Sequence, residues 1–181
     1  MTVPSIELLR KAILDSTKML KSNDGILFSA PIEEHSEYAG YDARKLHEVC
    51  INHKLAEHLA TNILPLLDKS QRMFVDIEFN REGINYKMVT IEGQEEKVRP
   101  DIIIHNRKSN EDKFNLLVVE CKKDDATDEF IQQDIKKIKA LMKDSRYEYH
   151  FGFQVSYGAA SVKGKIFYKQ NGSIVEEPIV T

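Results

Sequence analysis

Apolar residues that recur every three or four positions predict three helices. The first spans Ser5 to Lys21 and stops before Asn23-Asp24-Gly25. The second follows the polar stretch 33–42 and weakens at Pro65. One face of this helix is marked by Leu46, Val49, His53, Ala56, Ala60, Ile63 and Leu64, and His53 is expected at its surface or boundary. The third runs from about Thr127 to Lys143, and its apolar positions are Phe130, Ile131, Ile135, Ile138, Leu141 and Met142.

Between the second and third helices, apolar residues alternate with polar ones, which is typical of strands. Residues 73–79 predict one strand, and a turn at Glu82-Gly83 predicts that residues 84–92 return beside it as a hairpin. Asp101–His105 and Phe114–Lys122 predict two further strands, separated by a polar loop.

After the third helix, alternating aromatic and polar residues from Tyr147 to Val155 predict another strand. Residues 165–169 and 173–176 predict a terminal hairpin. In this order the elements predict an α/β fold with a mixed central sheet flanked by helices. We expect one domain, in which residues 1–40 form an N-terminal helix and loop appendage. Residues 41–156 then form the core, and 157–181 form the terminal hairpin.

The composition narrows the class of protein. A chain of 181 residues fits one domain, and 41% hydrophobic with 30% charged residues exclude a disordered or fibrous chain. No apolar run is long enough to cross a bilayer. Glu7, Arg10 and Lys11 stand where a signal peptide would be apolar, so we expect no secretion. Cys50 and Cys121 form neither a disulfide framework nor a metal quartet, which suits a reducing cytoplasm.

The charge of the chain is unevenly distributed. The net charge is −3, yet residues 132–169 hold eight basic residues and three acidic ones. A local basic surface of this kind can meet phosphate groups even on an acidic protein. A solvated helix face explains the same excess, and on charge alone that interpretation is favoured.

Candidate chemistry lies at the ends of two predicted strands. If Asp101–His105 and Phe114–Lys122 form a symmetric antiparallel hairpin, residues whose numbers add to 221 face each other. Asp101 then faces Glu120, with Cβ atoms about 4.5–5.5 Å apart. Alternation along a strand places Lys122 on the same face, whereas a slip of one residue would separate the set.

Two opposed carboxylates repel each other, and a divalent cation reverses the sign of that interaction. Asp101, Glu120 and the backbone carbonyl of Cys121 offer oxygen ligands that suit Mg²⁺, while the Cys121 side chain is expected in the core. Such an ion polarises a phosphoryl oxygen and lowers the pKa of an attacking water. Lys122 could orient that water or neutralise developing charge. The set therefore predicts metal-assisted hydrolysis of phosphodiesters.

Pro100-Asp101, a gap of eighteen residues and Glu120-Cys121-Lys122 resemble the signature of the PD-(D/E)xK nuclease superfamily. That resemblance implies the restriction-endonuclease-like fold, with an αβββαβ core within residues 41–156. More narrowly, residues 98–104 and 116–122 resemble the N-terminal nuclease domain of type I restriction motor (R) subunits and their small stand-alone relatives. The resemblance covers about residues 46–142. It implies a DNA nuclease in which Asp101 and Glu120 hold the metal and Lys122 assists catalysis.

The resemblance also implies an acidic metal ligand on the preceding helix. Glu48 is the best match there, and Glu57 is second. Restriction-like folds are often dimers, so a homodimer is expected by analogy.

The chain departs from these relatives in two ways. It has no Gly-x-x-x-x-Gly-Lys-Ser/Thr motif, so we expect neither a motor domain nor a nucleotide cofactor. A downstream Gln-x-x-x-Tyr element is also missing, because Gln133 is followed four residues later by Lys137. The candidate nucleic-acid-binding residues are Gln133, Lys136, Lys137 and Gln154.

Three functions are open at this point. The first is a Mg²⁺-dependent nuclease that cuts DNA, with Mn²⁺ as a substitute metal. The second is a catalytically inactive domain of the same fold that binds nucleic acid or a partner protein, because Pro-Asp and Glu-x-Lys are each common by chance. The third is an unrelated metabolic α/β protein, which is least favoured because the chain has no cofactor motif.

Overall fold

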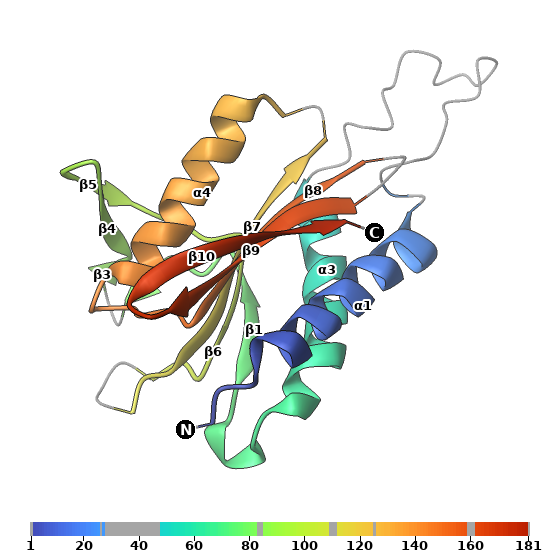
Figure 1. Cartoon of the computed structure of the whole chain (residues 1–181), viewed down its shortest axis with the longest axis horizontal. Helices are drawn as coiled ribbons and strands as arrows, with labels where there is room; N and C mark the ends of the chain where they lie inside the picture. Colours follow the sequence, from blue (N-terminus) through green and yellow to red (C-terminus); the bar gives the residue numbers. More distant parts are fainter. Residues whose placement is uncertain are drawn as a thin grey trace.

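The computed structural model describes residues 2–25, 27, 48–82, 85–108, 112–124, 126–158 and 162–180. The predictions above also used the polar stretch 33–42, Leu46, Gly83 and Ile84, which lie outside these ranges. A central sheet separates two helical layers (Figure 1). Helices α1 (Ile6–Asp24) and α3 (Glu48–Ile63) cover one face of the sheet, and α4 (Asp128–Lys143) covers the other.

The sheet has six strands in the order β1-β6-β7-β8-β9-β10. Their bounds are β1 Phe74–Ile77, β6 Ile102–His105, β7 Asn115–Lys123, β8 Phe151–Tyr157, β9 Val162–Gln170 and β10 Ser173–Val180. Strands β7 and β8 are parallel, and α4 connects them, as a parallel crossover requires. Every other neighbouring pair is antiparallel. The predicted mixed α/β architecture is therefore confirmed.

The first and third predicted helices form close to their expected bounds. The Ser5 side chain caps α1 by accepting a hydrogen bond from the Leu8 N–H at 3.4 Å. Helix α1 continues to Asp24, three residues beyond the predicted end. Thr127 is the N-cap residue of α4, which ends at Lys143 as expected.

The predicted face of the second helix is buried only in part. Ala56 and Ile63 are buried as expected, but Val49 is exposed, and His53 is exposed as expected of a surface histidine. The buried residues of α3 are Ile51, Asn52, Leu55, Ala56, Leu59 and Ile63. Both stripes have helical spacing, but the bulky aliphatic residues follow the observed one, and burial of aliphatic volume decides the rotation of the helix. Pro65 lies just past α3, in the short 3₁₀ helix Leu64–Leu66.

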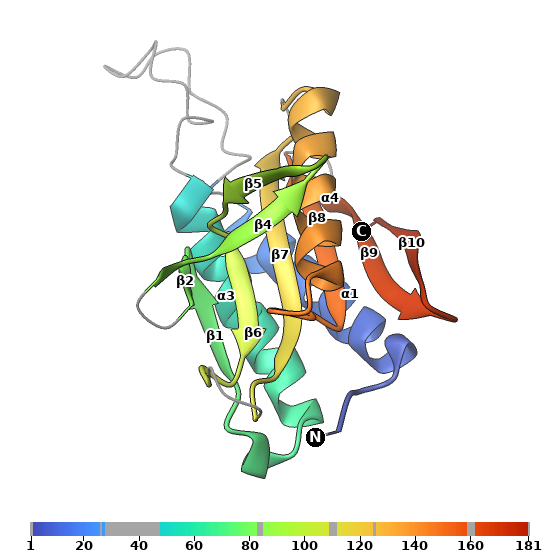
Figure 2. The same cartoon turned by 90° about the vertical axis from the view of Figure 1, so that its left-hand side faces the viewer.

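The predicted hairpin between residues 73–79 and 84–92 is also wrong. Strand β1 pairs with β6 instead. Two separate small ladders follow, one between β2 (Arg81–Glu82) and β3 (Asn85–Tyr86) and one between β4 (Met88–Ile91) and β5 (Gln94–Lys97). Glu92 and Gly93 both have positive φ, so they form the tight turn that joins β4 to β5. Figure 2 shows this second ladder on the α4 side of the sheet.

Alternation along the strands divides the core into two parts. Ile102, Ile104, Leu117 and Val119 pack toward α1 and α3, whereas Ile103 and Val118 pack toward α4. Strand β7 is buried on both faces, which explains its continuous apolar run. Helix α1 adds Leu9, Ala12, Ile13 and Leu20 to the first part, and the β9–β10 hairpin extends the same sheet. None of the helices in the described ranges combines the length and apolarity needed to cross a membrane.

Gly152 on β8 allows α4 to approach the sheet closely. A Cβ atom there would lie 2.2 Å from Ile138 Cγ2 and 3.2 Å from Met142 Sδ, so Gly152→Ala must displace the Ile138 side chain or the helix that carries it. We expect a loss of about 1–3 kcal/mol in the free energy of unfolding, measured by denaturant titration. Ile138→Ala removes the obstructing methyl group, so the double variant should lose less than the sum of both single losses. Strictly additive losses would contradict this contact.

Candidate functional site

Strands β6 and β7 adopt the expected register. Ile102 pairs with Val119, and Ile103 pairs with Val118, so the paired residue numbers add to 221. A register shift follows Ile104, where His105 pairs with Asn115. The pairing directs Glu120 and Lys122 to the α4 side of β7, the side that Val118 also faces.

Asp101 lies immediately before β6, and two backbone hydrogen bonds fix it. Its carbonyl oxygen accepts a hydrogen bond from the Glu78 N–H at 2.9 Å, and this bond continues the pairing of β1 with β6. Its carboxylate Oδ2 accepts from the Cys121 N–H at 2.7 Å, so the side chain reaches across to β7. The carboxylate of Asp101 is thereby held beside the residue that follows Glu120.

Glu120 is a buried carboxylate whose hydrogen-bonding capacity is not filled. Its side chain is 2% exposed, and Oε1 has no hydrogen-bond partner. Burial raises the pKa of Glu120 well above its usual value, and the charge of Asp101 raises it further. Burial likewise raises the pKa of Asp101, although the Cys121 N–H and Lys122 oppose the shift.

Asp134 on α4 joins the site, and the sequence analysis missed it. It is 1% exposed; its Oδ2 lies 3.0 Å from Lys122 Nζ, and its Oδ1 lies 2.9 Å from Lys137 Nζ. Lys137 Nζ is also 3.9 Å from Glu120 Oε2. The missed signal was an aspartate beside Ile135, within the apolar stripe of an amphipathic helix, where a charged residue needs a partner.

Both lysines in this cluster are ammonium cations. Burial lowers the pKa of Lys122, but Asp134 and Asp101 more than offset this effect, so its pKa is raised. Burial lowers the pKa of Lys137 too, and Glu120 with Asp134 reverses that shift. A raised pKa keeps Lys122 protonated, so it can neutralise developing charge but cannot act as a base.

The other candidate residues fall into two groups. Glu48, the first residue of α3, lies close enough for its charge to act on both Asp101 and Lys122. Gln154 is buried on β8 and pairs with Glu120 in the parallel ladder. Gln133 and Lys136 lie on the exposed side of α4, and Lys136 Nζ forms an ion pair with Glu92 at 2.6 Å.

Cys121 offers its carbonyl rather than its thiol. The side chain is fully buried in the core that faces α1 and α3, as expected, and burial raises the pKa of the thiol well above its usual value. The carbonyl oxygen accepts a hydrogen bond from Lys122 Nζ at 3.2 Å.

The donor set fits a hard divalent cation. Within the described ranges, no three His, Cys, Asp or Glu side chains converge as a complete ligand set. Mg²⁺, however, is commonly bound by one or two carboxylates and retains several waters. The buried carboxylate of Glu120, one oxygen of which has no hydrogen-bond partner, the half-buried carboxylate of Asp101 and a neighbouring carbonyl meet that requirement.

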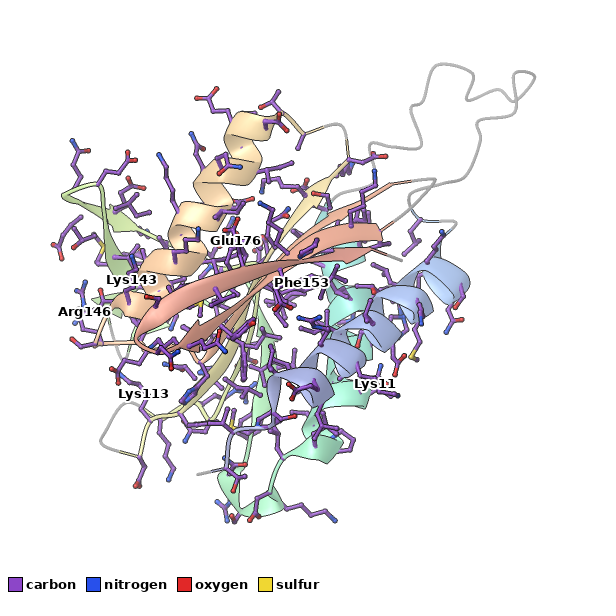
Figure 3. All side chains as sticks on the ribbon, viewed as in Figure 1. Lys11, Lys113, Lys143, Arg146, Phe153 and Glu176 are labelled. Atoms are coloured by element: carbon purple, nitrogen blue, oxygen red, sulfur yellow. The ribbon has the colours of Figure 1, made fainter. Side chains whose placement is uncertain are left out.

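Acidic residues from elsewhere in the chain partly neutralise the basic stretch. Lys139 on α4 and Lys165 on β9 both pair with Glu176 on β10, at 2.9 and 3.2 Å. Figure 3 shows Glu176 toward α4, and it places Lys143 and Arg146 near the carboxyl end of that helix. Arg146 pairs with Asp144 at 2.8 Å. These pairs favour a solvated, ion-paired surface over a broad basic patch.

No protein-family profile, curated protein or solved structure matches this chain. The geometry of the site must therefore carry any functional interpretation.

Removing the charge of Glu120 should stabilise the metal-free protein. Its folded-state pKa is raised, so its favourable contribution is complete below the usual value of 4.5 and is lost as pH rises through the folded-state pKa. At neutral pH and in EDTA, Glu120→Gln should therefore gain roughly 1–2 kcal/mol, or about 2–8 °C in melting temperature. The gain should disappear in acid.

Glu96→Gln on the exposed strand β5 is the matched control, because it removes the same charge outside the site. Thermal melts across the acid-to-neutral range compare both variants with the original chain. A Glu120→Gln protein that melts below the original chain at neutral pH would contradict the pKa direction.

Proposed function

We propose that the protein is a Mg²⁺-dependent nuclease that hydrolyses phosphodiester bonds in DNA. It would be of the type I restriction R-subunit N-terminal kind, without a motor domain. The observation that carries the proposal is the pair formed by half-buried Asp101 and buried Glu120, whose Oε1 has no hydrogen-bond partner, beside the ammonium group of Lys122. The carboxylates alone repel, and a hard cation is the ligand that relieves them.

The order of elements supports a restriction-endonuclease-like core. Helix α3 precedes β1, β6 and β7, which lie side by side, and α4 then leads to β8, parallel to β7. Leaving aside the small β2–β5 ladders inserted before β6, this is the αβββαβ order that the resemblance implies. The motif residues stand at the ends of β6 and β7, as the resemblance also implies.

Each residue of the site has a separate role in the proposed reaction. Asp101, Glu120 and the Cys121 carbonyl would hold Mg²⁺ or Mn²⁺, with Glu48 at the margin of the set. A bound divalent cation supplies positive charge to a phosphoryl oxygen and lowers the pKa of a bound water. Lys122 and Lys137 neutralise negative charge that develops on the phosphate oxygens.

DNA contacts are proposed for four residues around the site. Lys137 and Gln154 lie within or beside the carboxylate cluster, and Gln133 and Lys136 lie on the outer side of α4. Homodimer formation and a cytoplasmic location stay predictions from the sequence.

A catalytically inactive domain that binds nucleic acid or a partner protein is the second candidate. The observation that favours it is that Asp134 already pairs with both lysines, so neither ammonium group is free in this state. Calorimetric titration with Mg²⁺ or Mn²⁺ separates the two candidates, because a binding domain needs no cation at Asp101.

Plasmid cleavage in the presence of Mg²⁺ tests the nuclease. Asp101→Asn, Glu120→Gln and Lys122→Met should each lower the cleavage rate by about 100-fold or more, because each removes a ligand or a charge at the reacting phosphate. EDTA should abolish cleavage, and Mn²⁺ should restore it. Gel electrophoresis of supercoiled and linear DNA measures the rate.

Glu96→Gln again serves as the control and should cleave like the original chain. Activity that persists in Glu120→Gln or Lys122→Met, at the level of this control, would show that the nuclease resides elsewhere or in a contaminant.

A further inference from the structure

We propose that Asp134 is a positioning residue, which fixes the ammonium groups of Lys122 and Lys137 beside the Asp101–Glu120 pair. The inference rests on the proposed function, since a nuclease gives that arrangement its purpose. It concerns a residue that matches no part of the motif and comes from a different element, the crossover helix α4.

The geometry assigns one carboxylate oxygen to each lysine. Oδ2 faces Lys122 Nζ at 3.0 Å, and Oδ1 faces Lys137 Nζ at 2.9 Å. Lys122 comes from β7 and Lys137 from α4, so a single buried carboxylate ties the strand to the helix. The Lys137 contact is a hydrogen bond, whereas Oδ2 meets Lys122 as an ion pair and accepts no hydrogen bond, so one carboxylate holds both flexible side chains by charge and one of them also by a hydrogen bond.

Packing alone does not explain a charged residue at this position. Asp134 adjoins Ile135 on α4, whose buried face consists otherwise of Ile135, Ile138, Leu141 and Met142. An apolar residue there would avoid the cost of burying a carboxylate, and replacing buried ion pairs by apolar side chains is often neutral or stabilising. The presence of the Asp134 carboxylate despite the free-energy cost of burying it indicates that this residue has a role at the site.

Without Asp134, the two ammonium groups would turn to the remaining carboxylates. Lys137 Nζ already lies 3.9 Å from Glu120 Oε2, and Lys122 acts electrostatically on Asp101. Lysines paired with Asp101 and Glu120 would occupy the carboxylates that the cation requires. Asp134 thus leaves Glu120 Oε1 without a partner and keeps both cations within reach of a phosphate.

This role makes DNA binding and turnover respond in opposite directions. Asp134→Asn removes a negative charge from the site, so DNA binding in EDTA should be as tight as in the original chain or tighter. The turnover number in Mg²⁺ should nevertheless fall about 10–100-fold, the usual scale for losing a group that orients catalytic residues. A fold defect would weaken both quantities together.

The kinetic test compares three variants by fluorescence anisotropy for binding and by steady-state cleavage for turnover. Asp128→Asn removes the same charge from the exposed first turn of α4 and should leave turnover unchanged within about twofold. Asp134→Glu keeps the charge and should recover part of the turnover that Asp134→Asn loses. Unchanged turnover in Asp134→Asn, or parallel losses of binding and turnover, would overturn the proposal.

A second measurement needs no catalysis. In isotope-labelled, metal-free protein, proton–nitrogen spectra should show slowly exchanging ammonium signals for Lys122 and Lys137, assigned by Lys122→Met and Lys137→Met. Both signals should broaden or disappear in Asp134→Asn and persist in Asp128→Asn. Signals that survive in Asp134→Asn would overturn the positioning role, whereas a chain that shows the signals but never cleaves DNA would overturn the proposed function alone.

Discussion

The antiparallel pairing of β6 with β7 is the constraint on which the site depends. Ile103 faces Val118 toward α4, and the strands can move relative to each other only in steps of one residue, which would turn Ile103 toward the opposite core. Burial of the aliphatic residues therefore fixes the register. That register brings the Asp101 carboxylate to the Cys121 N–H and places Glu120 beneath α4. The free energy gained by burying the aliphatic residues thus holds two carboxylates together although they repel each other.

The charged groups around this pair carry two more negative than positive charges, and this excess suggests what would complete the site. Four carboxylates and two ammonium groups act on one another here, namely Asp101, Glu120, Asp134, Glu48, Lys122 and Lys137. One divalent cation would make the set neutral. Without a cation, burial and the charge of Asp101 raise the pKa of Glu120, and protonation of that residue then removes one of the negative charges. The chain thus gives up some stability at the place of the proposed cation site.

The parts of the fold that could be predicted are those where pattern and burial agree. The register of β6 and β7 followed from symmetric strands with apolar residues that alternate around Ile103. The rotation of α3 did not follow, because two stripes had helical spacing and only tertiary packing could choose between them. Asp134 was missed for a related reason: its importance comes from Lys122, twelve residues away in sequence and on another element, and no local spacing reveals that contact.

Helix α4 connects this site to the rest of the fold. It is the crossover between β7 and β8, and that parallel pairing sets Gln154 beside Glu120. The same pairing puts Gly152 opposite Val118, where the absence of a side chain lets Ile138 approach the sheet. Ile138 lies one helical turn after Asp134, so the depth at which the helix packs also sets how far Asp134 reaches toward β7. A glycine with no chemical role of its own thus determines whether a carboxylate can meet two lysines, and packing and chemistry at this site cannot vary independently.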